Sequence, residues 1–127
     1  MNKRRKLPNQ EGFTLIELLT VMIIMGVMGS VAIKKVDFIT DTARAEALAT
    51  AVKELNVRES LTWFNVKISN DGYTTDEDVF AALDKDLGDK FKWNPGLTID
   101  GGTLHFESQS IVLHRIPSTS SAAGRWQ

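Results

Sequence analysis

A long apolar segment near the start of the chain dominates its hydrophobic pattern. Residues 13–33 are 21 residues with a single formal charge, that of Glu17. An α-helix of this length spans about 30 Å, which is the thickness of the hydrocarbon layer of a bilayer. The pattern therefore predicts a membrane-spanning helix that carries one acid close to its beginning.

The helical pattern continues beyond the apolar segment. Residues 36–64 contain no Gly and no Pro, and they are rich in strong helix formers. Apolar residues three or four positions apart form a single apolar face along this stretch, made of Val36, Ile39, Ala43, Ala47, Ala51 and Leu55. We therefore expect one helix from Phe13 to about Phe64, whose second half is amphipathic and holds a small domain.

A second, short helix is expected after the turn signal Asn70-Asp71-Gly72. Thr74 or Thr75 has the character of an N-cap, with an acid three residues later. The apolar face of this helix comprises Val79, Phe80, Leu83 and Leu87, and Gly88 is expected to end it.

Two turn signals then predict an antiparallel meander of three strands. Gly101-Gly102 is a two-residue hairpin signal after a first strand at 97–100, and Ser108-Gln109 is expected to form a second two-residue loop. These loops would pair Ile99 with Leu104, Leu97 with Phe106, Phe106 with Ile111, and Leu104 with Leu113. All six side chains would share one face, which would pack on the long helix. The expected fold class is α+β.

The last residues have a composition typical of a flexible tail. Residues 118–124 are Ser, Thr, Ala and Gly, and Trp126 follows. Trp126 is expected to be a loosely packed terminal residue, with an anchor for a partner as the alternative.

The charges that flank the apolar segment predict its orientation. Lys3, Arg4, Arg5 and Lys6 precede it, and two lysines follow it at 34 and 35, so the short N-terminal segment is expected to stay in the cytoplasm. A secretory signal peptide is the alternative, with Ser30-Val31-Ala32 as a small-residue cleavage site. The length of the segment and the acid inside it argue against a signal peptide, because Glu17 would cost about 2.5–3.5 kcal/mol at the bilayer centre.

The string Gly12-Phe13-Thr14-Leu15-Ile16-Glu17 lies directly after the basic leader and directly before the apolar helix. In its order, in the charge of the leader and in the apolar run that follows, it resembles the N-terminal motif of the type IV pilin and type II secretion pseudopilin family. The resemblance covers residues 1 to about 64 as motif plus long helix, and the remainder in architecture alone.

This resemblance implies a processing site and an assembly site. Gly12 would be the last leader residue cut by prepilin peptidase, and Phe13 would become an N-methylated N-terminus. Glu17 would pair with the Phe13 amine of a neighbouring subunit, in a low dielectric where such a pair is strong. Gly26 falls where pilins often have a helix-loosening glycine. Lys34 replaces the proline of many major pilins, which favours a pseudopilin or minor-pilin role.

The expected organisation comprises four segments. They are a leader (1–12), a transmembrane and filament-core helix half (13–35), an exported globular domain that includes the amphipathic helix half (36–117), and a flexible tail (118–127). The chain would lie in the inner membrane with its domain in the periplasm or outside, and then in a filament. The implied partners are other pilin-like subunits, prepilin peptidase, the inner-membrane assembly platform, and membrane lipid before assembly.

The expected function is that of a structural filament subunit of a type IV pilus or type II secretion pseudopilus. A minor tip subunit that binds substrate, DNA or a surface is one alternative, and an unrelated signal-anchored protein with an uncut N-terminus is another. An enzyme is not expected, because two His and no Cys do not assemble into a nucleophile with an adjacent base. Residues 13–127 keep 11 Lys and Arg against 15 Asp and Glu, which does not favour nucleic acid.

No cofactor is expected, although two sets of residues could be considered as metal sites. His105, Glu107 and His114 share the solvent face of the predicted sheet, with the two histidines as diagonal neighbours, but a zinc site lacks a fourth ligand. The other set consists of four acids that could be considered for calcium: Asp84, Asp86, Asp89 and Asp100. Their spacing matches no known calcium-binding loop.

Overall fold

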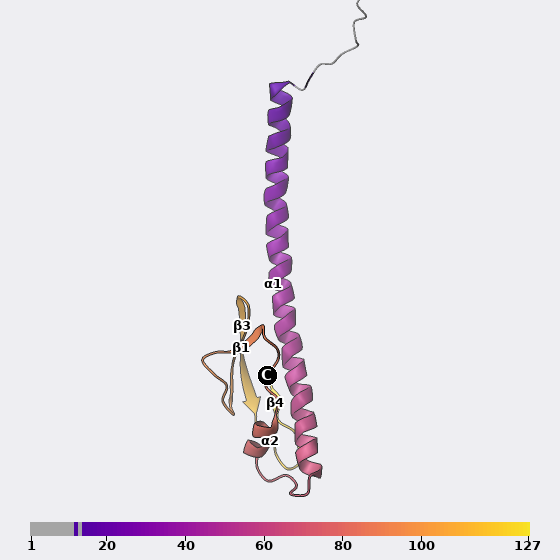
Figure 1. Ribbon diagram of the computed structural model, residues 1–127, viewed down its shortest axis with the longest axis vertical. Helices are drawn as coiled ribbons and strands as arrows, with labels where there is room; N and C mark the ends of the chain where they lie inside the picture. The colour runs from indigo at the N-terminus through magenta and orange to yellow at the C-terminus, as the bar shows by residue number, and fades with distance from the viewer. Residues whose placement is uncertain (1–11, 13) are drawn as a thin grey trace, which may run out of the picture. The chain divides into compact units, whose positions relative to one another are not determined.

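The computed structural model describes residues 12 and 14–127, and it divides the chain into two compact units, Met1–Phe38 and Ile39–Gln127. Figure 1 shows the elements, which are α1 (Leu15–Ile68), α2 (Asp76–Ala82), β1 (Phe91–Trp93), β2 (Gly101–Phe106), β3 (Gln109–Ile116) and β4 (Arg125–Trp126). Two helices and one antiparallel sheet confirm the α+β class, although the sheet has four strands rather than the three predicted.

The first unit consists of the early segment of α1 within the described residues. Every residue from 14 to 38 is exposed, and an 18-residue window of this helix has a mean hydropathy of 2.2. By length and composition this helix is able to cross a membrane. A helix segment that is apolar on all sides, and that none of the described residues covers, needs lipid or other helices around it.

The sheet in the second unit has the order β1-β2-β3-β4, and every neighbouring pair is antiparallel. The first strand was predicted at 97–100, and this is wrong. Phe91 lies opposite Phe106 and Trp93 opposite Leu104, whereas Thr98 and Gly101 exchange backbone hydrogen bonds of 2.9 and 3.1 Å in a tight turn. The two aromatic residues bury more apolar surface against β2 than a leucine and an isoleucine would.

The hairpin between β2 and β3 has a different register from the predicted one. Its loop is Glu107-Ser108 rather than Ser108-Gln109, so Leu104 lies opposite Ile111 and not opposite Leu113. Glu107 has a φ of 52°, a left-handed conformation that two-residue hairpin loops use. Because the shift is by two residues, the predicted apolar face of β2 and β3 is retained.

The core of the second unit lies between α1, the sheet and the segment around α2. Its buried members are Leu48, Ala51, Leu55, Leu83, Leu104, Leu113 and Trp126. In the predicted apolar face of the long helix, Ala51 and Leu55 are buried, whereas Val36 and Ile39 are more than 60% exposed. The domain therefore covers only the later portion of the face that the sequence predicted.

The expectation of a loose tail with a loose Trp126 is wrong. Residues 125–126 form β4, in which Trp126 pairs with Arg115, and the Trp126 side chain is only 2% exposed. Its indole Nε1–H donates to Glu59 Oε2 over 3.0 Å. Gly124 passes so close to α1 that an added Cβ would lie 2.5 Å from Glu59 Oε1. The segment is therefore packed against a buried carboxylate that the sequence pattern did not reveal.

Glu59 belongs to a buried ion cluster that joins four segments of the second unit. Arg115 on β3 donates to Glu59 through Nε (3.1 Å) and Nη2 (2.5 Å), and to Asp76 through Nη1 and Nη2 (both 2.7 Å). Asp76 at the start of α2 also accepts from the backbone N–H and hydroxyl of Ser118. The side chains of Glu59 and Arg115 are fully buried. Among the described residues, no buried side-chain polar atom lacks a hydrogen-bond partner.

Arg115→Leu should destabilise the protein by about 3–5 kcal/mol, because it leaves Glu59 buried without its cation. The exposed Arg125→Leu serves as the control and should change the free energy of unfolding by less than about 0.5 kcal/mol. Urea titration of the detergent-solubilised chain, followed by tryptophan fluorescence, measures both. Equal effects of the two substitutions would contradict the role given to the cluster.

Asp76 should make stability depend on acidity. Burial opposes its charge, but the hydrogen bonds from Arg115 and Ser118 outweigh burial and hold the pKa of Asp76 below its ordinary 3.8. A depressed folded-state pKa stabilises the protein above the unfolded pKa, and this contribution is lost as pH falls through the folded value. The stability gap between the wild type and Asp76→Asn should therefore be full above pH about 5 and shrink below about 4. Urea midpoints of the wild type and Asp76→Asn that differ by the same amount from neutral to acid pH would contradict this.

Candidate functional site

The beginning of α1 forms a reciprocal cap around Glu17. The Thr14 backbone N–H donates to Glu17 Oε2, and the Glu17 backbone N–H donates to Thr14 Oγ1, both over 3.2 Å. The Leu18 N–H donates to the Thr14 carbonyl over 3.1 Å, which starts the helix. Thr-x-x-Glu is a capping box, in which two N–H groups without helical partners are satisfied by each other's side chains. Our sequence interpretation missed this role, although the spacing before an apolar run was a sufficient signal.

The capped carboxylate is placed where its charge is most favourable within the helix. An anion in the first turn interacts well with the positive end of the helix dipole. Capping takes one acceptor position of Glu17, whereas a carboxylate offers about four. The side chain is exposed in the described chain. Glu17 is therefore held in a fixed direction while it keeps the capacity to accept a cation.

The structure describes two of the other three residues of the predicted processing, assembly and helix-flexibility sites. Gly12 is exposed, has no regular structure, and has nothing within 4 Å of the position of an added Cβ. Phe13 lies outside the described residues. At Gly26 the helix α1 continues without interruption, and an added Cβ would also meet nothing within 4 Å. The helix-loosening role of Gly26 stays a prediction.

The predicted arrangement of the two histidines is wrong. The observed register places His105 opposite Ser110 and His114 opposite Gly101. Four residues of β2 therefore separate the two histidine levels, about 13 Å along the strand rather than a diagonal contact. Within residues 12 and 14–127 no group of three or more His, Asp or Glu is placed to hold a metal ion.

Two of the acids considered for calcium are used within their own loop. Asp84 Oδ1 accepts the backbone N–H of Asp86, and Asp86 Oδ1 accepts that of Gly88, both over 3.0 Å. Arg58 donates to the carbonyl of Asp86 over 2.7 Å and lies 3.5 Å from the Asp84 carboxylate. These carboxylates thus shape the segment after α2 and attach it to α1.

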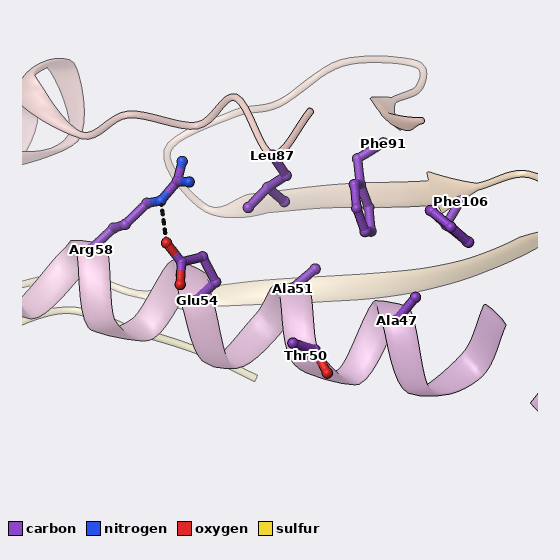
Figure 2. A pocket seen from close by; sticks show the side chains of 8 residues that line it. All are labelled: Ala47, Thr50, Ala51, Glu54, Arg58, Leu87, Phe91 and Phe106. Carbon is purple, nitrogen blue, oxygen red and sulfur yellow. Dashed lines mark hydrogen bonds and ion pairs between the residues drawn. The ribbon is translucent and has the colours of Figure 1, made fainter. Parts of the chain in front are cut away.

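A second candidate site is an apolar groove of about 390 Å³ in the second unit. Figure 2 shows the α1 side chains on one side and Leu87, Phe91 and Phe106 on the other. The rings of Phe91 and Phe106 pack with centroids 4.7 Å apart. The ion pair Glu54–Arg58, at 2.9 Å, is the polar portion of the lining. We define the apolar groove by Ala47, Ala51, Leu87, Phe91 and Phe106.

Together, the exposed apolar helix segment, its capped acid and the small α+β unit define a class of protein: one in which a helix suited to a membrane leads into a small α+β unit. Residues 7–33 match the family model described as the prokaryotic N-terminal methylation motif, the signature of type IV pilins and pseudopilins. The match includes Gly12, Phe13, Glu17 and Gly26. A motif of this kind is that of structural subunits that assemble with other pilin-like subunits after processing by prepilin peptidase. The comparison with curated proteins found no match, and neither did the comparison with solved structures.

Proposed function

We propose that this chain is a structural subunit of a type IV pilus or type II secretion pseudopilus, cut after Gly12 and assembled through the apolar half of α1. The observation that carries the proposal is the capped acid of Glu17, inside the matched motif and at the beginning of the exposed apolar half of α1. The basic residues before the helix outnumber the lysines after it, which supports an N-terminus in the cytoplasm and a domain on the other side of the inner membrane.

Cleavage explains how the acid gains a partner. Cutting after Gly12 frees the amine of Phe13, which then carries a positive charge directly before the positive end of its own helix dipole. The charged amine is stabilised when an anion lies close to it, and Glu17 of a neighbouring subunit supplies such an anion. In lipid or between packed helices such a charge-assisted pair is stronger than in water. The pair would also fix the axial register of neighbouring subunits, which is the best-attested use of a buried polar contact.

Replacement of the glycine tests the processing step. Gly12→Val should block leader removal, because a branched side chain would occupy the position that the peptidase must accept at the cut. Mass spectrometry of the membrane fraction should show the full-length chain for this variant and a methylated Phe13 N-terminus for the wild type. A mature-sized chain from Gly12→Val would contradict the assigned cut.

Two matched substitutions separate the charge of Glu17 from its capping role. Glu17→Gln removes the charge but keeps an oxygen that can accept the Thr14 N–H, so membrane insertion should be normal while incorporation into filaments is lost. Thr14→Val removes the capping hydroxyl, at a cost of about 1 kcal/mol, but keeps the acid, so incorporation should persist. Sheared filaments and membranes, compared by immunoblot, give both readings. Normal incorporation of Glu17→Gln would exclude the pairing with the amine.

A further inference from the structure

Two apolar surfaces of the second unit are left uncovered by the described residues. The first is the apolar groove. The second, which we call the apolar stripe, consists of Val57, Leu61, Phe64 and Ile68 on α1, whose side chains are 54–65% exposed. Steps of four, three and four residues place these side chains on one face of the helix. Contiguous exposed apolar surface of this kind marks a site of association.

The membrane does not explain the apolar stripe. The apolar run ends at Ile33, and Lys34 and Lys35 follow it directly. Val57 lies 24 residues after Ile33 in the sequence, and the stretch between them contains many charged residues. The stripe also does not belong to the core, because Phe64 follows Leu55 by two and a half turns and so lies on the opposite side of the helix. The stripe is therefore a surface suited to contact with another protein.

We propose that the apolar groove of one copy of this chain receives the apolar stripe of the next copy, with Phe64 as the anchor. This inference rests on the proposed function. A helical filament repeats one heterologous contact, so each subunit needs two different surfaces that fit each other. The groove volume of about 390 Å³ is that of a pocket able to enclose a group of this size, and a buried aromatic side chain is the usual centre of such a contact.

The charges around the two surfaces are complementary. At the Leu87 end of the groove, two carboxylates, those of Glu54 and Asp84, form ion pairs of 2.9 and 3.5 Å with the guanidinium of Arg58, so the rim there has an excess of negative charge. The stripe is flanked by two exposed lysines, Lys53 one turn before Val57 and Lys67 next to Ile68. The Lys67 ammonium donates to the Ser120 carbonyl over 2.9 Å, which leaves its positive charge in place. Opposite charges at the rim of an interface fix its register. Contact of one stripe with another would instead bring lysines together, so the groove is the better partner.

The absence of cysteine from the sequence makes a disulfide test direct. Two full-length single-cysteine chains, Ala47→Cys in the groove and Phe64→Cys in the stripe, are co-expressed in cells that assemble the filament, and the filaments are then mildly oxidised. The mixed pair should give about tenfold more linked dimer than either chain alone, because the contact raises the local thiol concentration and brings the sulfurs into bonding range. Val112→Cys, on an exposed apolar side chain of β3, replaces Phe64→Cys in the control pair.

Each other outcome overturns the inference in an identifiable way. Phe64→Cys dimers formed without Ala47→Cys would indicate contact of stripe with stripe, and equal linkage of the Val112→Cys control would indicate random collision. Filaments that contain normally cut chains but no mixed dimer would remove the inference and leave the proposed function intact. Chains that are neither cut nor incorporated would remove both.

A charge placed on the stripe gives an independent reading. Phe64→Asp should reduce incorporation into filaments about tenfold, since the new carboxylate would enter an apolar groove that has Glu54 and Asp84 at one end. Val112→Asp, at an apolar position of the sheet that is also more than half exposed, should leave incorporation unchanged. Equal incorporation of both variants, with normal cleavage of each, would contradict the contact.

Discussion

The contact on which the second unit depends is the buried pair of Arg115 and Glu59. The guanidinium of Arg115 on β3 donates hydrogen bonds both to the carboxylate of Glu59 on α1 and to that of Asp76 at the beginning of α2. Burial disfavours the charge of Arg115, but the hydrogen bonds to Asp76 and Glu59 outweigh burial and raise its pKa above the ordinary value. Each of these groups would be costly to bury alone, so helix, sheet and connecting segment are held in one arrangement that satisfies all three charges.

The same region shows how a small domain without cysteine holds its C-terminal segment. Three consecutive carbonyls, those of Ser118, Thr119 and Ser120, accept hydrogen bonds of 2.8–2.9 Å. The donors are Tyr73, Trp63 and Lys67, which come from the end of α1 and the loop after it. Small exported domains often use a disulfide for such a closure. Here side chains from the end of the long helix and from the loop after it supply the attachment, and β4 completes it.

The periodicity of apolar residues predicted those features of the fold that depend on residues close together in the sequence. The long helix, the start of the short helix and the apolar face of β2 and β3 follow from spacing that the chain displays directly. The short helix ends at Ala82, however, and not at Gly88 as the apolar spacing predicted. Strand register and the first strand depend on the φ of Glu107 and on competition between Phe91–Trp93 and residues 97–100 for the same edge of β2, which spacing does not reveal. Glu59 and Arg115 look like ordinary surface residues in the sequence, because the partner of each lies 56 residues away. The N-terminal methylation motif was recognisable in the sequence, because its residues are contiguous.

The long-range character of the core also bears on the order of events during export. α1 precedes in sequence every segment that covers it. The hydrogen-bond partners of Glu59 come much later in the chain: Arg115 follows it by 56 residues and Trp126 by 67 residues. In the orientation proposed above, the helix emerges across the membrane with Leu55 and Glu59 still uncovered. Contacts between segments so distant in sequence form slowly and only when both are present. In that proposed orientation, the order of residues along the chain would couple the folding of the domain to the completion of its own translocation.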